Sequence, residues 1–100
     1  MSALSVFGFD WDAGNRQKCG KHGVSPDEIE DVFQGEILVA PDPMHSGAEV
    51  RSIAIGRTRA GRALFIAFTL RLKAGEMLIR PVSARYMHRK EIEAYETKGS

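Results

Sequence analysis

Cationic side chains and one imidazole concentrate between residues 82 and 96, which read VSARYMHRKEIEAYE. The segment begins like the end of a buried strand, supplies Arg85, His88, Arg89 and Lys90, and continues as a helix. A guanidinium offers paired donors in one plane and keeps its charge at physiological pH, which suits phosphate recognition. An imidazole titrates near neutral pH and can transfer a proton. The segment is therefore either a site for an anion or a solvated corner without a ligand.

Further candidates for phosphate chemistry lie on other predicted elements. Lys21 and His22 stand at the end of a predicted helix, and Glu49 precedes a long predicted hairpin. Arginines along the predicted strands complete the set: Arg51, Arg57, Arg71, Arg80. A base in such a set could take the proton of a ribose 2′-hydroxyl while an arginine stabilises the extra charge on the phosphate. The residue types thus indicate a metal-independent RNA-cleaving surface.

Several of these residues also have an ordinary structural role that the sequence leaves open. His22 can satisfy the last carbonyl groups of a helix, and His45, in a Pro-rich loop, can simply be solvated. Glu49 and Arg51 can form a surface ion pair. Glu91 can accept a backbone hydrogen bond at the start of the last helix.

Motifs for nucleotides, cofactors and metals are missing from the sequence. It has no Gly-rich phosphate loop, no GxSxG elbow and no HExxH. The single cysteine, Cys19, excludes an internal disulfide, and the three histidines lack the spacing of metal ligands. No apolar run approaches the ~20 residues that span a bilayer, and no signal peptide is recognisable. We expect one domain over residues 1–100, no cofactor, no metal, no membrane contact and a cytoplasmic location.

Charge is distributed unevenly between the two halves of the chain. Residues 1–50 contain three Lys/Arg and nine Asp/Glu, for a net charge of −6, whereas residues 51–100 contain eleven and four, for +7. The second half can therefore build a surface that faces a polyanion. The alternative is that the two halves neutralise each other in the fold.

Hydrophobic periodicity predicts an α+β fold of order β-α-α-β-β-β-β-α. The predicted strands are residues 5–12, 36–40, 49–57, 62–71 and 76–85, with Pro81 requiring an edge position or a bulge. Ser25, Pro26 and Glu28 are typical of a helix start and predict a helix over 26–34. A short helix should follow Asp12, and the last helix should cover 88–96. We expect an antiparallel sheet with the two N-terminal helices and the C-terminal helix packed on it.

Five short motifs in register resemble the BrnT toxins of type II toxin–antitoxin pairs. They are KHGVS at 21–25, the E-x-R of Glu49 and Arg51, IGR at 55–57, SAR at 83–85 and the late Glu91, Tyr95 and Glu96. The resemblance runs from about Phe9 to Glu96. His88 departs from it, because many relatives have a threonine cap there.

The resemblance implies a RelE-like fold, RNA cleavage that arrests growth, and neutralisation by a ribbon-helix-helix antitoxin, BrnA, with operator DNA bound only by the complex. It points to Lys21, His22, Glu49, Arg57 and Arg85 as catalytic residues, with Arg51, Arg80 and Arg89 as substrate contacts. Arg57 and Arg85 would hold the scissile phosphate. Glu49 or His22 would be the base, and Lys21 would neutralise the leaving side. His88 is a weaker helix cap than the threonine of relatives, so at this departure from the family we expect a functional imidazole that acts as a general acid.

Two other function classes compete with the ribonuclease. A non-catalytic module could use the same cations to bind RNA or an antitoxin, because a binder needs the arginines but no base. A DNA-binding regulator is disfavoured, because no predicted helix carries a basic recognition face.

Overall fold

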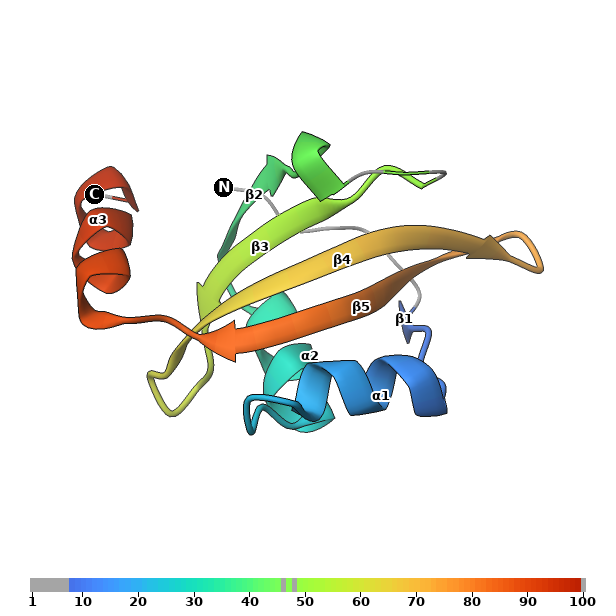
Figure 1. Cartoon of the computed structure of the whole chain (residues 1–100), viewed down its shortest axis with the longest axis horizontal. Helices are drawn as coiled ribbons and strands as arrows, with labels where there is room; N and C mark the ends of the chain where they lie inside the picture. Colours follow the sequence, from blue (N-terminus) through green and yellow to red (C-terminus); the bar gives the residue numbers. More distant parts are fainter. Residues whose placement is uncertain (1–7, 46, 48, 100) are drawn as a thin grey trace.

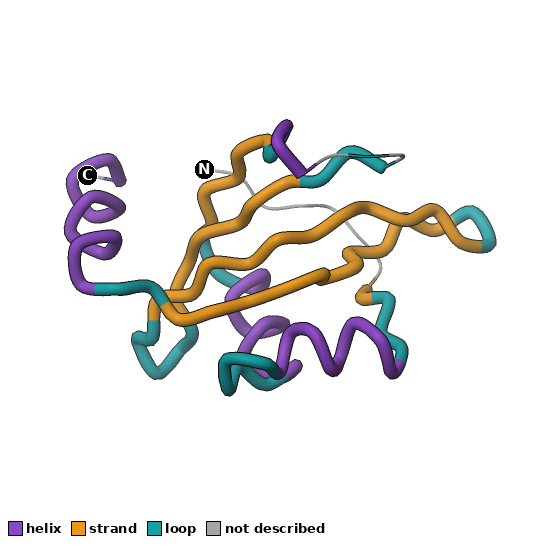
Figure 2. The backbone as a smooth tube through the Cα atoms, viewed as in Figure 1, coloured by secondary structure: helices purple, strands orange, loops and turns teal. Residues whose placement is uncertain are grey.

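The computed structural model describes residues 8–45, 47 and 49–99 of the chain. Figure 1 shows the elements in chain order, and Figure 2 colours the same path by helix and strand. Their bounds are β1 (Gly8–Phe9), α1 (Ala13–Gly20), α2 (Pro26–Gln34), β2 (Ile37–Pro41), the 3-10 turn η1 (Pro43–His45), β3 (Ser52–Arg57), β4 (Ala63–Lys73), β5 (Glu76–Tyr86) and α3 (Arg89–Gly99). The α+β class predicted from the sequence is confirmed. Residues 5–7 of the first predicted strand lie outside the described residues.

The strands form one sheet in the order β1-β5-β4-β3-β2. Strands β2 to β5 are antiparallel neighbours, but β1 pairs with β5 in parallel. The prediction of a purely antiparallel sheet was therefore wrong, and the sheet is mixed. Alternation of side chains predicts a strand, but it carries no information about which distant strand will be its neighbour or in which direction.

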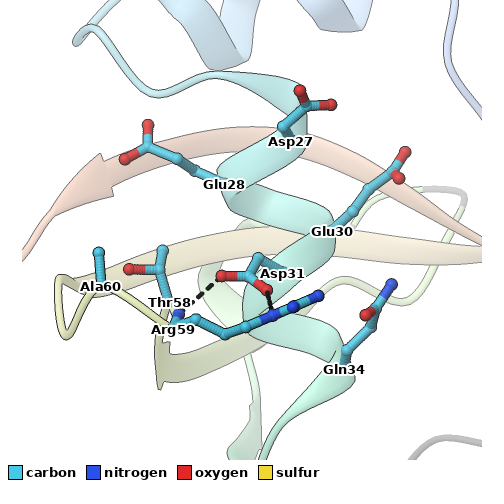
Figure 3. Close-up of a pocket in the computed structure, with 8 residues that line it drawn as sticks. All are labelled: Asp27, Glu28, Glu30, Asp31, Gln34, Thr58, Arg59 and Ala60. Carbon is cyan, nitrogen blue, oxygen red and sulfur yellow. Dashed lines mark hydrogen bonds and ion pairs between the residues drawn. The ribbon is translucent and has the colours of Figure 1, made fainter.

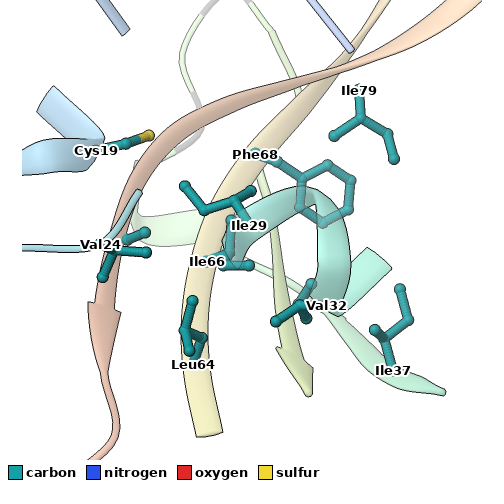
Figure 4. Packing of buried hydrophobic residues seen from close by; sticks show 11 residues of the cluster. Cys19, Val24, Ile29, Val32, Ile37, Leu64, Ile66, Phe68 and Ile79 are labelled. Atoms are coloured by element: carbon teal, nitrogen blue, oxygen red, sulfur yellow. The ribbon is translucent and has the colours of Figure 1, made fainter. Parts of the chain in front are cut away.

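Helices α1 and α2 cover one face of the sheet (Figure 1). Ile29 and Val32 of α2 pack there against Leu64, Ile66 and Phe68 of β4 (Figure 4). Within the described part of the chain, no helix covers the opposite face of the sheet. We call this second surface the open face.

Helix α3 does not pack on the sheet, contrary to the prediction. It lies beyond the end of β5, away from α1 and α2 (Figure 1). Its two larger apolar side chains, Ile92 and Tyr95, are only half-buried. Two apolar residues make too small a stripe to hold a helix of this length against a sheet by burial alone.

Local sequence explains where the first two helices begin. Asp12 caps α1 and Ser25 caps α2, each with a reciprocal bond from the third helical residue, as the sequence predicted for Ser25. Gly23 adopts a positive φ of 85° in the connection between the helices.

Pro81 is accommodated beside an irregularity in the β4–β5 register, where Ala67 pairs with Ser83 but Phe68 pairs with Pro81. The predicted bulge is confirmed. None of the helices that the structure describes is long and apolar enough to traverse a bilayer.

Candidate nucleic-acid interface

Two arginines stand on the open face at the end of the sheet that leads into α3. Arg57 of β3 pairs with Ala63, and Arg85 of β5 pairs with Phe65, so the two arginines flank β4. Gly56 and Ala84 face the helices, and alternation turns the next residue of each strand to the open face. Strand spacing of ~4.8 Å and a rise of ~3.3 Å place the two Cα atoms about 12 Å apart. We call Arg57 and Arg85 the arginine pair.

The guanidinium group of Arg85 is bound at both of its Nη atoms and packs with one face on an aromatic ring. Its Nη1 and Nη2 atoms donate to Oε1 and Oε2 of Glu91 at 2.7 and 2.8 Å. Its guanidinium carbon lies 4.5 Å from the centroid of the Phe65 ring. The hydrogen bonds from Arg85, then the backbone N–H of His88, lower the pKa of Glu91 to about 2, and the same carboxylate raises the pKa of Arg85. The pair therefore stays ionised throughout the physiological range.

Arg57 is also engaged by a carboxylate of α3. Its Nη1 atom donates to the carbonyl oxygen of Gly61 at 2.8 Å, and its Nη2 atom pairs with Glu96. Both members of the arginine pair therefore bind glutamates of the same helix. Figure 1 shows α3 standing at the end of the sheet that carries them.

His88 stands next to this cluster at the start of α3. Its backbone N–H donates to Oε1 of Glu91 at 2.9 Å, and its carbonyl oxygen accepts from Ile92 at 2.9 Å. The predicted bond between Glu91 and the backbone is thus confirmed. The same carboxylate oxygen accepts from Arg85, so His88 and Arg85 share one partner. The imidazole is exposed.

Glu49 and Arg80 lie at the other end of the open face. Glu49 accepts from Arg71 at 2.7 and 3.1 Å. Arg71 is six residues along β4 from Phe65, the partner of Arg85, which corresponds to about 20 Å at ~3.3 Å per residue. Glu49 is therefore too far away to act on a phosphate held by the arginine pair.

Arg80 belongs to an ion-pair cluster that joins β5 to the residues after β1. It pairs with Asp12 at 2.9 Å and with Asp10 at 3.5 Å, and Asp10 also binds Lys73 at 2.9 Å. Asp10 is 7 % exposed, and its pKa is lowered chiefly by the hydrogen bond from Lys73. This geometry fixes the strand end and accounts for Arg80 without a ligand.

Lys21 and His22 lie on the helix-covered side of the sheet. Both are exposed in the connection between α1 and α2. The neighbouring Gly23 carbonyl meets the hydroxyl of Tyr86 at 3.2 Å, and Tyr86 points away from the open face. The structure therefore does not bring Lys21 or His22 together with the arginine pair. Arg89 is exposed in the first turn of α3, and Arg51 directly precedes β3.

Sequence reasoning missed a cavity of about 430 Å³ between α2 and the β3–β4 turn (Figure 3). Carboxylates dominate its lining, which comprises Asp27, Glu28, Glu30, Asp31, Gln34, Thr58, Arg59 and Ala60. The backbone N–H and Nε of Arg59 bind Asp31 at 2.7 and 2.9 Å. The signal available in the sequence was the acidic run around Ile29, whose charged members face away from the core. No group of metal-ligating side chains occurs among the residues with described positions.

The fold and the open face together define a small α+β domain with an arginine-bearing sheet surface, a class suited to polyanions. Residues 11–91 match the family model described as the ribonuclease toxin BrnT of a type II toxin–antitoxin system. The match covers most of the chain, so this protein belongs to the BrnT family, as its motifs indicated. A comparison with curated proteins gives no match.

Proposed function

We propose that this protein is a metal-independent endoribonuclease toxin that cleaves RNA through the ribose 2′-hydroxyl. The observation that carries the proposal is the position of Arg57 and Arg85 on either side of β4 on the open face. Side chains of ~6 Å reach from Cα atoms about 12 Å apart to one phosphodiester between them. Two permanent cations at that point would stabilise the extra negative charge that develops on the phosphate during attack.

Proton transfer at this end of the sheet falls to His88. The 2′-oxygen would attack phosphorus and displace the 5′-oxygen, leaving a 2′,3′-cyclic phosphate and a 5′-hydroxyl. The 2′ proton must be taken up and the leaving 5′-oxygen must be protonated; in this proposal solvent water takes the first proton and His88 donates the second. The backbone N–H of His88 and the guanidinium of Arg85 bind the same Glu91 carboxylate, so the exposed imidazole belongs to a residue beside the arginine pair, whereas Glu49 and His22 lie elsewhere. The roles of Lys21, Arg51 and Arg89 stay predictions.

The family also supplies the biological setting of the proposal. We propose that the toxin arrests growth in the cytoplasm and that a ribbon-helix-helix antitoxin of the BrnA kind neutralises it. Operator DNA would be bound only by that complex. A RelE-like arrangement agrees with two helices packed on one face of a sheet whose other face carries no helix among the described residues.

One observation favours a second function, a binding module without catalysis. Each member of the arginine pair already has a carboxylate partner, and Glu49, the predicted base, is bound to Arg71. In this reading the open face would grip RNA or the antitoxin through its cations and cut nothing.

The test is cleavage of a 5′-labelled RNA by antitoxin-free protein in EDTA. We compare wild type with Arg85→Ala, Arg85→Lys and His88→Ala, each shown to be folded by circular dichroism. Arg59→Ala is the matched control, because it removes one exposed arginine of the β3–β4 turn whose guanidinium binds Asp31 of α2 and not a glutamate of α3. We expect Arg85→Ala to lose about 10²-fold or more in rate, and Arg59→Ala to stay within about threefold of wild type. Salt-sensitive binding without any cleavage would instead establish the binding module.

A further inference from the structure

The carboxylates of α3 occupy the hydrogen-bond donors that a phosphate would need. Glu91 accepts hydrogen bonds from both Nη atoms of Arg85, and Glu96 accepts one from Nη2 of Arg57. A carboxylate and a phosphate present similar pairs of oxygens to a guanidinium. The two acids are five residues apart on one helix and engage arginines from two different strands.

The ion pairs of Glu91 and Glu96 join α3 to β5 and β3, whereas few of the described side chains of the helix are apolar. Ile92 and Tyr95 are half-buried, and the intervening Glu93 and Ala94 are exposed. The helix lies beyond the sheet rather than on its hydrophobic core (Figures 1 and 2). Both ion pairs are partly exposed, so a phosphate with similar oxygen geometry can compete with the carboxylates for the two guanidinium groups. The Glu91 and Glu96 side chains are 34 % and 60 % exposed, so water and ligands reach both.

We propose that α3 is an autoinhibitory latch: Glu91 and Glu96 occupy the arginine pair in the resting protein, and RNA phosphates displace them as α3 swings away. This inference rests on the proposed function, since it makes the arginine pair the place where RNA binds. It goes beyond that function by giving the resting protein a closed state. The hinge for this opening is His88, because Met87 before it is buried and its backbone N–H donates to the carbonyl oxygen of Ala63 at 3.0 Å.

The test measures binding separately from cleavage. The probe is a fluorescein-labelled 20-nucleotide 2′-O-methyl oligouridine, which lacks the hydroxyl needed for self-attack. Glu91→Gln and Glu96→Gln each remove a carboxylate of the latch while keeping the side-chain shape. Glu93→Gln is the matched control, because it makes the same charge change on an exposed side chain of the same helix.

The latch predicts that Glu91→Gln binds the probe about fivefold more tightly than wild type, equivalent to about 1 kcal/mol. Glu96→Gln, whose carboxylate is far more exposed, should give a smaller gain, and Glu93→Gln should stay within about twofold. Amide hydrogen exchange in α3 should accelerate when the probe binds to wild type. Equal affinities for Glu91→Gln and Glu93→Gln would overturn the latch, as would slower or unchanged exchange in α3. An absence of cleavage would contradict only the proposed ribonuclease activity, because the latch is tested by probe affinity and by amide exchange in α3.

Discussion

Arg85 illustrates how neighbouring groups prepare one side chain for its role. Phe65 supports one face of the guanidinium and Glu91 fixes its fork, so the group loses little freedom when an anion takes the place of the carboxylate. Sequence reasoning assigned Arg85 to phosphate and Glu91 to the helix cap, but it did not connect the two. The side chains meet because Glu91 lies in the first turn of α3, directly after the short connection from β5, and the spacing of residues does not encode the direction in which α3 leaves the strand.

Glu91 should titrate far below an ordinary glutamate. Its pKa of about 2 lies below the ordinary 4.5, so the ion pair stabilises the docked helix fully above pH 4.5. That contribution is lost as the pH falls through about 2. Carbon-detected NMR titration of the Glu91 carboxyl measures the value directly. In Arg85→Ala the pKa should rise toward 4.5, because the hydrogen bonds from Arg85 are the largest cause of the shift. A normal value in the wild type would mean that Glu91 and Arg85 are not paired in solution.

Gly56 lies where α2 and the start of β2 approach β3 closely. A Cβ at this position would lie 3.0 Å from Cγ1 of Val32 and 3.1 Å from the carbonyl oxygen of Glu36. Gly56→Ala should therefore lower the free energy of unfolding by about 1–3 kcal/mol, as measured by urea denaturation. Gly20→Ala is the control, because no atom lies within 4 Å of its Cβ and it ends a helix. It should leave stability unchanged or raise it by up to about 1 kcal/mol. Equal effects of both changes would show that α2 can retreat from β3.

At the scale of elements, the sequence was sufficient to predict features that depend on neighbouring residues, but it did not predict how elements distant in the sequence pack together. Ser25 and Glu28 predicted the start of α2, and Pro81 predicted the irregularity in β5, because each acts on its own backbone. The parallel pairing of β1 and the position of α3 were predicted wrongly. Both depend on which distant surface accepts an element, and Ile92 and Tyr95 give α3 too little apolar area to decide it.

The β4–β5 turn carries one residue in an unfavourable conformation. Ala74 and Gly75 have φ values of 51° and 79°, which is the backbone of a type I′ turn. Alanine is strained there, whereas Asn-Gly is the favoured pair. Ala74→Asn should raise the free energy of unfolding by about 0.5–1 kcal/mol. Ala60→Asn, in the β3–β4 turn without a positive φ, should change it by less than about 0.5 kcal/mol. A destabilised Ala74→Asn would contradict the assigned turn geometry.

At the scale of the molecule, ion pairs show that the two halves partly neutralise each other, whereas a surface that faces a polyanion stays a prediction. Ion pairs such as Asp10–Lys73, Asp31–Arg59 and Glu49–Arg71 join the acidic first half to the basic second half. Neutralisation is therefore real, and it includes Glu49, the predicted base, which is paired with Arg71 at the end of the sheet away from Arg57. The arginine pair is different, because its acidic partners come from α3, within the basic half itself. The candidate residues were thus largely readable from the sequence, whereas their division between two ends of the sheet needed the register.

The separation of the arginine pair from the other cations predicts how salt should change the affinity for RNA. Each phosphate contact on a single strand adds about 0.7 to the slope of log affinity against log salt concentration. Arg85→Ala should make the slope shallower by about 0.7, because it removes one contact on the open face. Arg59→Ala changes the net charge equally, but Arg59 binds Asp31 beside α2, so its slope should match the wild type. Fluorescence anisotropy with the labelled oligouridine between 50 and 200 mM salt, a range over which phosphate-binding proteins lose much of their affinity, measures both slopes. Equal slopes for the two variants would mean that RNA responds to total charge and not to the open face.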